Sequence, residues 1–337
     1  MLRRRTLMAM VASASWVMPL AAVAQEPVKL KFAFWLSDKG SDYRDVLKPW
    51  VERVEAASEG AVKIKIYTGG TLGRDPAAQL KMVEDGVADI AYPVPNYTPG
   101  RFPENSITDL PGLFSSSTEA STVMWGLYEQ GLLSGFDGLK VLGLFGSQPF
   151  TIDSVRATTK LADLEGQKLR AAGKYAIPTV ELLGAAAVGL TVSESAEALT
   201  RGVIDGVTSH PSLSSQTGSA DIARNHYLLG LHIGHVMLVM KQEAFDALPE
   251  KARVAINAES GLKLSRAWGE VQDRDAQALI AKWSENGSGH TVTRPSAADL
   301  AAVAPKFEEI RAIWQSEDPA RAKLLDAAEA LKTDVAR

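Results

Sequence analysis

The sequence predicts an α/β protein with two similar lobes, on the basis of three observations. The chain has 337 residues, about twice the length of a typical single domain of roughly 150 residues. Residues 28–94 follow the order strand, helix, strand, helix, strand, which forces parallel pairing with right-handed crossovers. A similar rhythm returns at residues 139–207 without a sequence repeat, which favours two lobes over a repeat array.

The elements of the first unit follow from the spacing of apolar residues. Residues 28–34 alternate and then become continuously apolar, residues 61–67 alternate, and residues 88–94 form a short apolar run. These three segments are predicted strands. Apolar residues recur at helical spacing in residues 46–54 and 80–87, which predicts the two intervening helices.

The second unit is predicted from the same two patterns. Its apolar runs predict strands at residues 139–145, 167–171, 186–192 and 202–207. Its helical spacing predicts helices at residues 176–183 and 193–201.

The third part of the chain is predicted to be helical. Residues 242–285 keep irregular three- and four-residue apolar steps, broken mildly by Pro249 and Gly261. A helix from Pro249 to Trp283 would be about 50 Å long, enough to bridge both lobes. Two more helices are predicted at residues 297–314 and 319–336, with Ser296 and Asp318 as their N-caps.

Residues 1–24 are predicted to be a signal peptide. Arg3–Arg5 form a positive head, an apolar run extends from Leu7 to Val23, and Ala22–Ala24 has the small-x-small pattern of a cleavage site. Cleavage is expected before Gln25, with a periplasmic mature protein. A membrane anchor is the alternative, and the Arg pair leaves open whether export uses the general secretory or the twin-arginine route.

The composition argues against several classes of function. The formal charge is −4, and loss of residues 1–24 removes three Arg and no acidic residue. Without a basic cluster after residue 5, nucleic acid is not an expected partner. The chain has no Cys, so it can form neither disulfides nor thiolate sites.

No motif for catalysis, metal or cofactor binding occurs in the sequence. Of the five His, His232 and His235 lie three apart in a predicted strand, where this spacing places them on opposite faces. Phosphate-binding, dinucleotide-binding and hydrolase motifs are absent. We therefore expect no catalytic residue, no metal and no cofactor, and a protein that is not an enzyme.

Residues 163–170 read D-L-E-G-Q-K-L-R. This segment resembles the D-L-x-G-x-K-x-R strand of the DctP-like solute-binding proteins of tripartite ATP-independent periplasmic (TRAP) transporters. Further similar blocks follow in the same order and spacing, at residues 32–35, 69–73, 86–89, 110–114, 183–185, 193–194, 198–206 and 245–249. The resemblance spans nearly the whole predicted mature chain.

The resemblance implies a two-lobed periplasmic-binding-protein fold of type II-like topology, with strands that cross between the lobes and a long bridging helix. Lobe I would comprise residues 25–147, with residues 236–270 returning to it. Lobe II would comprise residues 148–235, with residues 271–337 packing on or across it.

The implied function is the extracytoplasmic capture of a small organic acid by hinge closure and its delivery to the small and large membrane subunits of a TRAP transporter. Two alternatives stay open at this point. One is a periplasmic sensor that presents its ligand to a receptor, and the other is a periplasmic enzyme on the same scaffold.

Arg170 is the first candidate for ligand binding, because the family places the Arg of this motif in the cleft. A guanidinium grips a carboxylate through two parallel hydrogen bonds. The alternative is an exposed strand Arg in a surface ion pair. Position along the chain adds further candidates for the cleft wall, namely Trp35, Asn96 and Tyr97 after predicted strands, Gln148 near the lobe crossover, and Tyr175.

Four more candidates come from departures from the family pattern. Phe150 stands where the sialic-acid-binding branch has a second Arg, Ser209 and His210 stand at the family's cleft Asn, and Val192 stands where Phe often precedes S-E. A polar ligand would leave its groups unpaired in such a pocket, at about 1–3 kcal/mol each. We therefore expect a monocarboxylate with an apolar or aromatic body.

Overall fold

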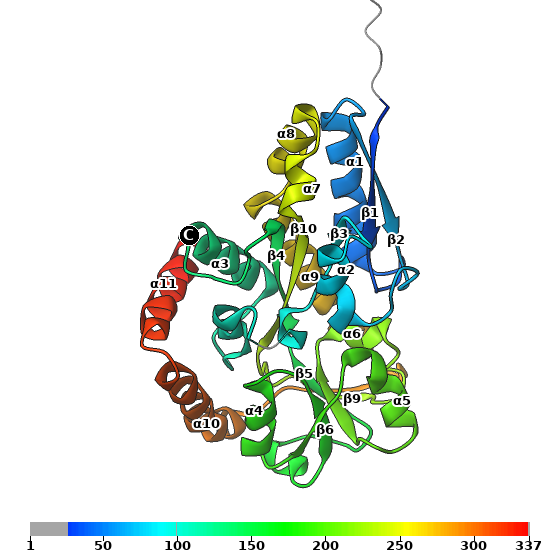
Figure 1. Cartoon of the computed structure of the whole chain (residues 1–337). Coiled ribbons are helices and arrows are strands. Elements are labelled where there is room, and N and C mark those ends of the chain that lie inside the picture. The colour runs from blue at the N-terminus through cyan, green and yellow to red at the C-terminus, as the bar shows by residue number, and fades with distance from the viewer. Residues whose placement is uncertain (1–25, 99, 336–337) are drawn as a thin grey trace, which may run out of the picture.

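The computed structural model of the protein describes residues 26–98 and 100–335. The predicted signal peptide and its cleavage site lie outside the described residues. The described chain forms two lobes, each built on its own sheet (Figure 1). This arrangement agrees with the two-lobed α/β fold that the sequence predicts.

The lobe I sheet has the strand order β2-β1-β3-β10-β4. Its members are β1 (Val28–Ala33), β2 (Val62–Tyr67), β3 (Ile90–Ala91), β4 (Leu139–Pro149) and β10 (Ile233–Lys241). β1 pairs in parallel with β2 and β3, as the βαβ order predicts. β10 runs antiparallel to β3 and β4, because it enters the sheet from the other lobe.

The lobe II sheet has the order β11-β9-β5-β8-β6-β7. Its strands are β5 (Thr151–Ser154), β6 (Lys168–Ala171), β7 (Ala186–Gly189), β8 (Gly206–Ser209), β9 (Asn225–Tyr227) and β11 (Thr291–Thr293). β6 pairs in parallel with β7 and β8, whereas β5 pairs antiparallel with β8 and β9.

Two extended segments carry the chain between the sheets. β4 continues into β5 with only Phe150 between them, and a short segment joins β9 to β10. The two segments are hydrogen bonded where they cross: the Phe150 N–H donates to the His232 carbonyl (2.8 Å), and the Leu231 N–H donates to the Phe150 carbonyl (2.9 Å). Phe150 is therefore a central residue of the connection.

Short helices cover both sheets. In lobe I these are the π-helix η1 (Asp42–Leu47), α1 (Lys48–Ala57), α2 (Gln79–Glu84) and α3 (Ser117–Glu129). In lobe II they are α4 (Ala176–Leu182), α5 (Ser195–Thr200) and α6 (Pro211–Gln216). The sequence analysis missed α3, because its buried face mixes Ser with apolar residues and has no clean helical period.

The predicted continuous helix after residue 242 is wrong. The structure divides this segment into α7 (Gln242–Asp246), α8 (Glu250–Glu259) and α9 (Leu262–Trp283). Gly261 has a φ of 76°, which ends the helical path before α9. α9 alone is about 33 Å long, and it packs on α3 and β4 of lobe I and on α6 and β11 of lobe II. The bridging role therefore belongs to α9.

Helices α10 (Ala297–Ser316) and α11 (Ala320–Val335) form an arc from α4 to α3 at the side of the molecule (Figure 1). Both predicted N-caps are confirmed: the Ser296 hydroxyl accepts from the Asp299 N–H (3.1 Å), and the Asp318 carboxylate accepts from the Ala320 N–H (2.8 Å). Among the described residues, no helix combines the length and apolarity needed to cross a membrane.

Helices α3 and α9 make one of the closest contacts of the fold, at Gly269. A Cβ atom at this position would lie 2.6 Å from the Thr118 Cα and 2.8 Å from the Ser117 carbonyl oxygen. Both are backbone atoms, so the helices would have to separate to admit a methyl group.

We expect Gly269→Ala to lower the free energy of unfolding by about 1–3 kcal/mol, measured by urea denaturation. Gly189→Ala is the matched control, because the added Cβ would have only an ordinary contact at 4.0 Å with Ile177. Its change should stay within about 0.5 kcal/mol. Equal losses in the two variants would contradict the proposed role of close α3–α9 packing.

Candidate ligand-binding site

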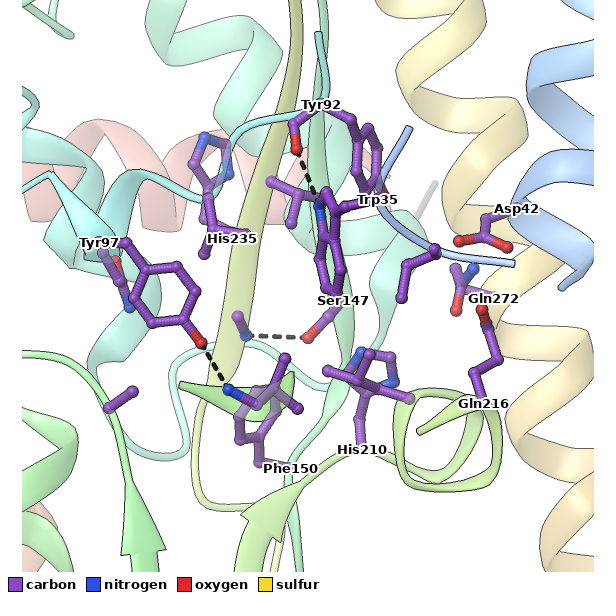
Figure 2. A pocket seen from close by; sticks show the side chains of 18 of the residues that line it. Trp35, Asp42, Tyr92, Tyr97, Ser147, Phe150, His210, Gln216, His235 and Gln272 are labelled. Atoms are coloured by element: carbon purple, nitrogen blue, oxygen red, sulfur yellow. Dashed lines mark hydrogen bonds between the residues drawn. The ribbon is translucent and has the colours of Figure 1, made fainter. Parts of the chain in front are cut away.

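A cavity lies between the lobes, and its walls come from both sheets, from the crossing strands and from α9. Its empty space, with the open mouth included, is about 730 Å³. The lining residues that the argument uses are Trp35, Asp42, Tyr97, Arg170, Gln216 and His235. Figure 2 shows most of these side chains around the central Trp35.

Arg170, at the end of β6, is the main charged group of this cavity. Its side chain is buried, since the residue is only 3% exposed. The guanidinium donates to the Leu190 carbonyl (2.9 Å), the Thr208 carbonyl (3.2 Å) and the Tyr97 hydroxyl oxygen (2.9 Å). The ion pairs of arginine among the described residues are all made by other arginines. Arg170 is thus not the exposed, ion-paired strand residue of the alternative prediction.

The hydrogen bonds of Arg170 leave part of its donor capacity unused. A guanidinium has five N–H groups, and those on Nε, Nη1 and Nη2 each make one of the bonds above. One N–H on each terminal nitrogen remains, so the guanidinium can still donate two hydrogen bonds to a carboxylate.

Tyr97 extends this polar end of the cavity from lobe I. Its hydroxyl oxygen accepts from Arg170 and from the Val192 N–H (3.1 Å), a bond that Figure 2 shows. With two bonds accepted, the hydroxyl proton is the group that remains to donate. The contact also joins the lobes, because Tyr97 belongs to the loop after β3 and Arg170 to β6.

The middle of the cavity is apolar. The ring of Trp35 lies at the centre of Figure 2, and its Nε1–H donates to the Tyr92 carbonyl (3.1 Å), which orients the indole. Val192 and Phe150 also line this apolar part. The Phe150 ring packs against His232, with 4.4 Å between ring centres.

Three His lie in the wall and are neutral at physiological pH. Burial lowers the pKa of His210, of His232 and of His235 to about 3, and the charge of Arg170 adds to the effect at His232. Arg170 is therefore the one cation among the described lining residues at pH 7.

A buried carboxyl group, Asp42, lies at the other end of the cavity, beside Gln216 and Gln272 (Figure 2). Burial raises its pKa to about 7, and the negative charge of Asp275 adds to this shift. The hydrogen bond from the Tyr43 N–H (3.0 Å) opposes the shift only in part.

The structure brings seven of the ten predicted site residues together in this cavity. They are Trp35, Asn96, Tyr97, Phe150, Arg170, Val192 and His210. No bound ligand tests their roles, so their contact with a ligand stays a prediction.

The other three predicted residues lie elsewhere. Gln148 is buried behind the wall, where its amide oxygen accepts from the Ser212 N–H (3.0 Å) and its amide nitrogen donates to the Gln272 carbonyl (2.8 Å). Ser209 is buried in β8 and is not part of the cavity lining. Tyr175 lines a second pocket, where its hydroxyl donates to Glu317 (2.6 Å).

Sequence reasoning missed several lining residues, above all Asp42, Gln216, His235 and Gln272. A signal existed for two of them. Asp42 follows the loop after the first strand, where ligands bind in open α/β sheets. Gln272 lies one turn after Trp268 on the buried face of α9, where a polar residue is unexpected. Within residues 26–98 and 100–335, no group of three metal-binding side chains occurs.

The neutral His235 gives the site a measurable pH dependence. The His235 side chain is 0% exposed, and neither ring nitrogen has a hydrogen-bond partner within the described part of the chain. Because the folded-state pKa of about 3 lies below the ordinary histidine pKa of 6.5, the unfolded chain binds more protons between these pH values. This group therefore costs stability as the pH falls below 6.5.

We expect wild-type protein to lose about 1–3 kcal/mol more unfolding free energy than His235→Gln between pH 7.5 and 4.5. Urea denaturation at each pH measures the unfolding free energy of both proteins. The contributions of the other titratable groups cancel in the difference between wild type and variant. Parallel pH profiles for the two proteins would contradict a buried neutral imidazole.

Comparison with known proteins places this geometry among related binding proteins. A solved TRAP solute-binding protein from Rhodoferax ferrireducens, in complex with copurified benzoate, is similar with 26% identity and a TM-score of 0.85, covering 92% of this chain and 100% of that one. A marine metagenome TRAP solute-binding protein specific for aromatic acid ligands, in complex with metahydroxyphenylacetate, shows 28% identity and a TM-score of 0.84, with 91% and 99% covered.

A curated relative is the dicarboxylate-binding periplasmic protein DctP of Rhodobacter capsulatus, which is 26% identical over 83% of this chain and 85% of its own. The profile of the family described as "Bacterial extracellular solute-binding protein, family 7" matches residues 32–317. The resemblance stated from residues 163–170 is thereby confirmed, and the chain belongs to this family of extracellular solute-binding proteins, whose members include TRAP solute-binding proteins.

Proposed function

We propose that this protein binds a small monocarboxylate with an apolar or aromatic body and delivers it to the membrane subunits of a TRAP transporter. The observation that carries the proposal is the buried guanidinium of Arg170, which faces the cavity between the lobes without a carboxylate partner among the described residues.

A buried charge is costly unless it is paired and hydrogen bonded. Arg170 has three hydrogen bonds but only neutral partners. A ligand carboxylate on its two remaining N–H groups would supply the missing negative charge, and the Tyr97 hydroxyl could donate a third hydrogen bond. Such charge-assisted bonds are about twice as strong as neutral ones.

The rest of the cavity favours an apolar ligand body. Trp35, Val192 and Phe150 offer flat or branched apolar surface, and an indole can stack on an aromatic ring. Two of the similar structures hold benzoate and metahydroxyphenylacetate, which supports an aromatic acid.

A dicarboxylate is a poor candidate, although a relative carries that ligand in its name. The second carboxylate would find no second cation among the described lining residues, and at the far end it would face Asp42. Because the pKa of Asp42 is about 7, the group is ionised in part of the molecules at pH 7, and in these the two like charges would repel each other.

Binding would close the two lobes on the ligand. Arg170 comes from lobe II and Tyr97 from lobe I, so a carboxylate held by both draws the lobes together. We place the lobe boundaries near residues 147–148 and 235–236, with α9 as the bridge. The closed form would be the one that the membrane subunits recognise.

We expect Arg170→Ala to weaken benzoate binding by about 30-fold or more, which corresponds to roughly 2 kcal/mol or more. Arg170→Lys keeps the charge but loses the fork, and should cost about 10- to 100-fold. Isothermal titration calorimetry measures both affinities.

Arg201→Ala is the matched control, because Arg201 is exposed directly after α5 and, among the described residues, forms its ion pair with Glu197 (3.0 Å). It should bind benzoate like wild type. Binding that survives both Arg170 variants unchanged would refute the proposed carboxylate site.

We also expect export to the periplasm with removal of residues 1–24. Mass spectrometry of protein released from the periplasm of a producing cell should find a mature chain that begins at Gln25. Recovery of the full-length chain from the membrane fraction would favour the anchor instead.

A further inference from the structure

The end of the cavity opposite Tyr97 is polar, and a carboxylate with a purely apolar body would form no hydrogen bonds with the polar groups there. In Figure 2, Tyr97 and Asp42 lie on opposite sides of Trp35, and Gln216 and Gln272 lie next to Asp42. These three polar residues come from η1 in lobe I, α6 in lobe II and α9. All three line the same cavity as Arg170.

Gly40 lies in close contact with the polar groups at this end of the cavity. A Cβ atom at Gly40 would lie 2.2 Å from the Asp42 Oδ1 and 2.6 Å from the Gln216 Oε1. Any side chain at position 40 would therefore displace both polar groups. The residue Asp42 is only 2% exposed, so its carboxyl group is held in the cavity wall rather than in bulk water.

The three polar side chains at this end leave a definite set of hydrogen-bond donors and acceptors free. Asp42 Oδ1 accepts from the Tyr43 N–H, and the Gln216 side chain also bonds to this carboxyl group. With its pKa near 7, the carboxyl group keeps room for a further donor in either protonation state. The Gln216 Oε1 is buried and has no hydrogen-bond partner among the described residues. The Gln272 Oε1 accepts from Gln148 (3.1 Å), so its remaining polar group is the NH₂, a donor.

Two acceptors and one donor suit a hydroxyl group. A hydroxyl can donate its proton to Asp42 or Gln216 and accept from the Gln272 NH₂. An ammonium group has no lone pair to accept from the Gln272 NH₂, and a carboxylate has no proton to donate to the Gln216 Oε1. A methyl group would leave buried polar atoms unpaired.

We infer that the ligand carries a hydroxyl group at its end away from the carboxylate, and that Asp42, Gln216 and Gln272 form the subsite that recognises it. This inference rests on the proposed function, because Arg170 must first fix the carboxylate at the other end. The ligand class is then an aromatic hydroxy acid rather than an unsubstituted aromatic acid.

The test compares matched acids that differ by one hydroxyl. Phenylacetate and 3-phenylpropanoate are titrated against their ortho-, meta- and para-hydroxylated forms. We expect at least one hydroxylated isomer to bind wild-type protein about 10-fold more tightly than its parent acid. The isomer that gains most reports where the subsite lies relative to Arg170.

Variants of the subsite residues test whether the higher affinity of the hydroxylated acid depends on the subsite. In Asp42→Asn and in Gln216→Leu, the affinity ratio of the hydroxylated acid to its parent should fall to within about 2-fold of one. Asp45→Asn is the matched control, because Asp45 lies on the same π-helix but is exposed and pairs with Arg274 (2.6 Å). It should keep the wild-type ratio. Two independent variants keep the test decisive if one of them does not fold.

The outcomes separate the two proposals. If the parent acids bind in an Arg170-dependent way but no hydroxylated isomer gains more than about 2-fold, the inference is wrong and the proposed function stands. A gain that persists in both subsite variants also overturns the inference. If none of the acids binds, both proposals are wrong.

Discussion

The cavity is organised around the positive charge of Arg170, which has no negatively charged partner among the described residues. Arg170 is buried and has only neutral hydrogen-bond partners among the described residues. An anion bound beside it would stabilise this buried charge further. The partners of Arg170 also come from both lobes, since Tyr97 follows β3 in lobe I, whereas Leu190 and Thr208 belong to lobe II. Under the proposed function, ligand affinity and lobe closure would therefore depend on the same ion pair with Arg170.

The remaining polar groups of the cavity are arranged so that they do not compete with Arg170. Three buried His have pKa values lowered to about 3 and stay neutral, and the one buried carboxyl group of the wall lies at the opposite end. Trp35 separates the two ends. A cavity with a cation at one end, an apolar middle and acceptors at the other selects ligands by orientation as well as by charge.

The fold brings these groups together by crossing the chain between lobes. Phe150 lies where β4 passes into β5, and the His232 carbonyl accepts its N–H, so the connection itself forms the floor of the cavity. α9 contributes Trp268 and Gln272 from the side. Gln148 supports this floor from behind, because it holds α6 and α9 through Ser212 and Gln272. Relative motion of the lobes must therefore change the shape of the site.

The sequence by itself determined the α/β class, the parallel β1–β3 unit, both C-terminal helix caps and, through residues 163–170, the family and Arg170. These features depend on local periodicity or on a short contiguous motif. Only the tertiary structure decided that α9 is a separate helix, that Gln148 and Tyr175 lie outside the cavity, and that Asp42 and Gln272 lie inside it. Burial and hydrogen-bond partners depend on residues distant in the chain, such as Gln148 and Gln272, which no local pattern connects.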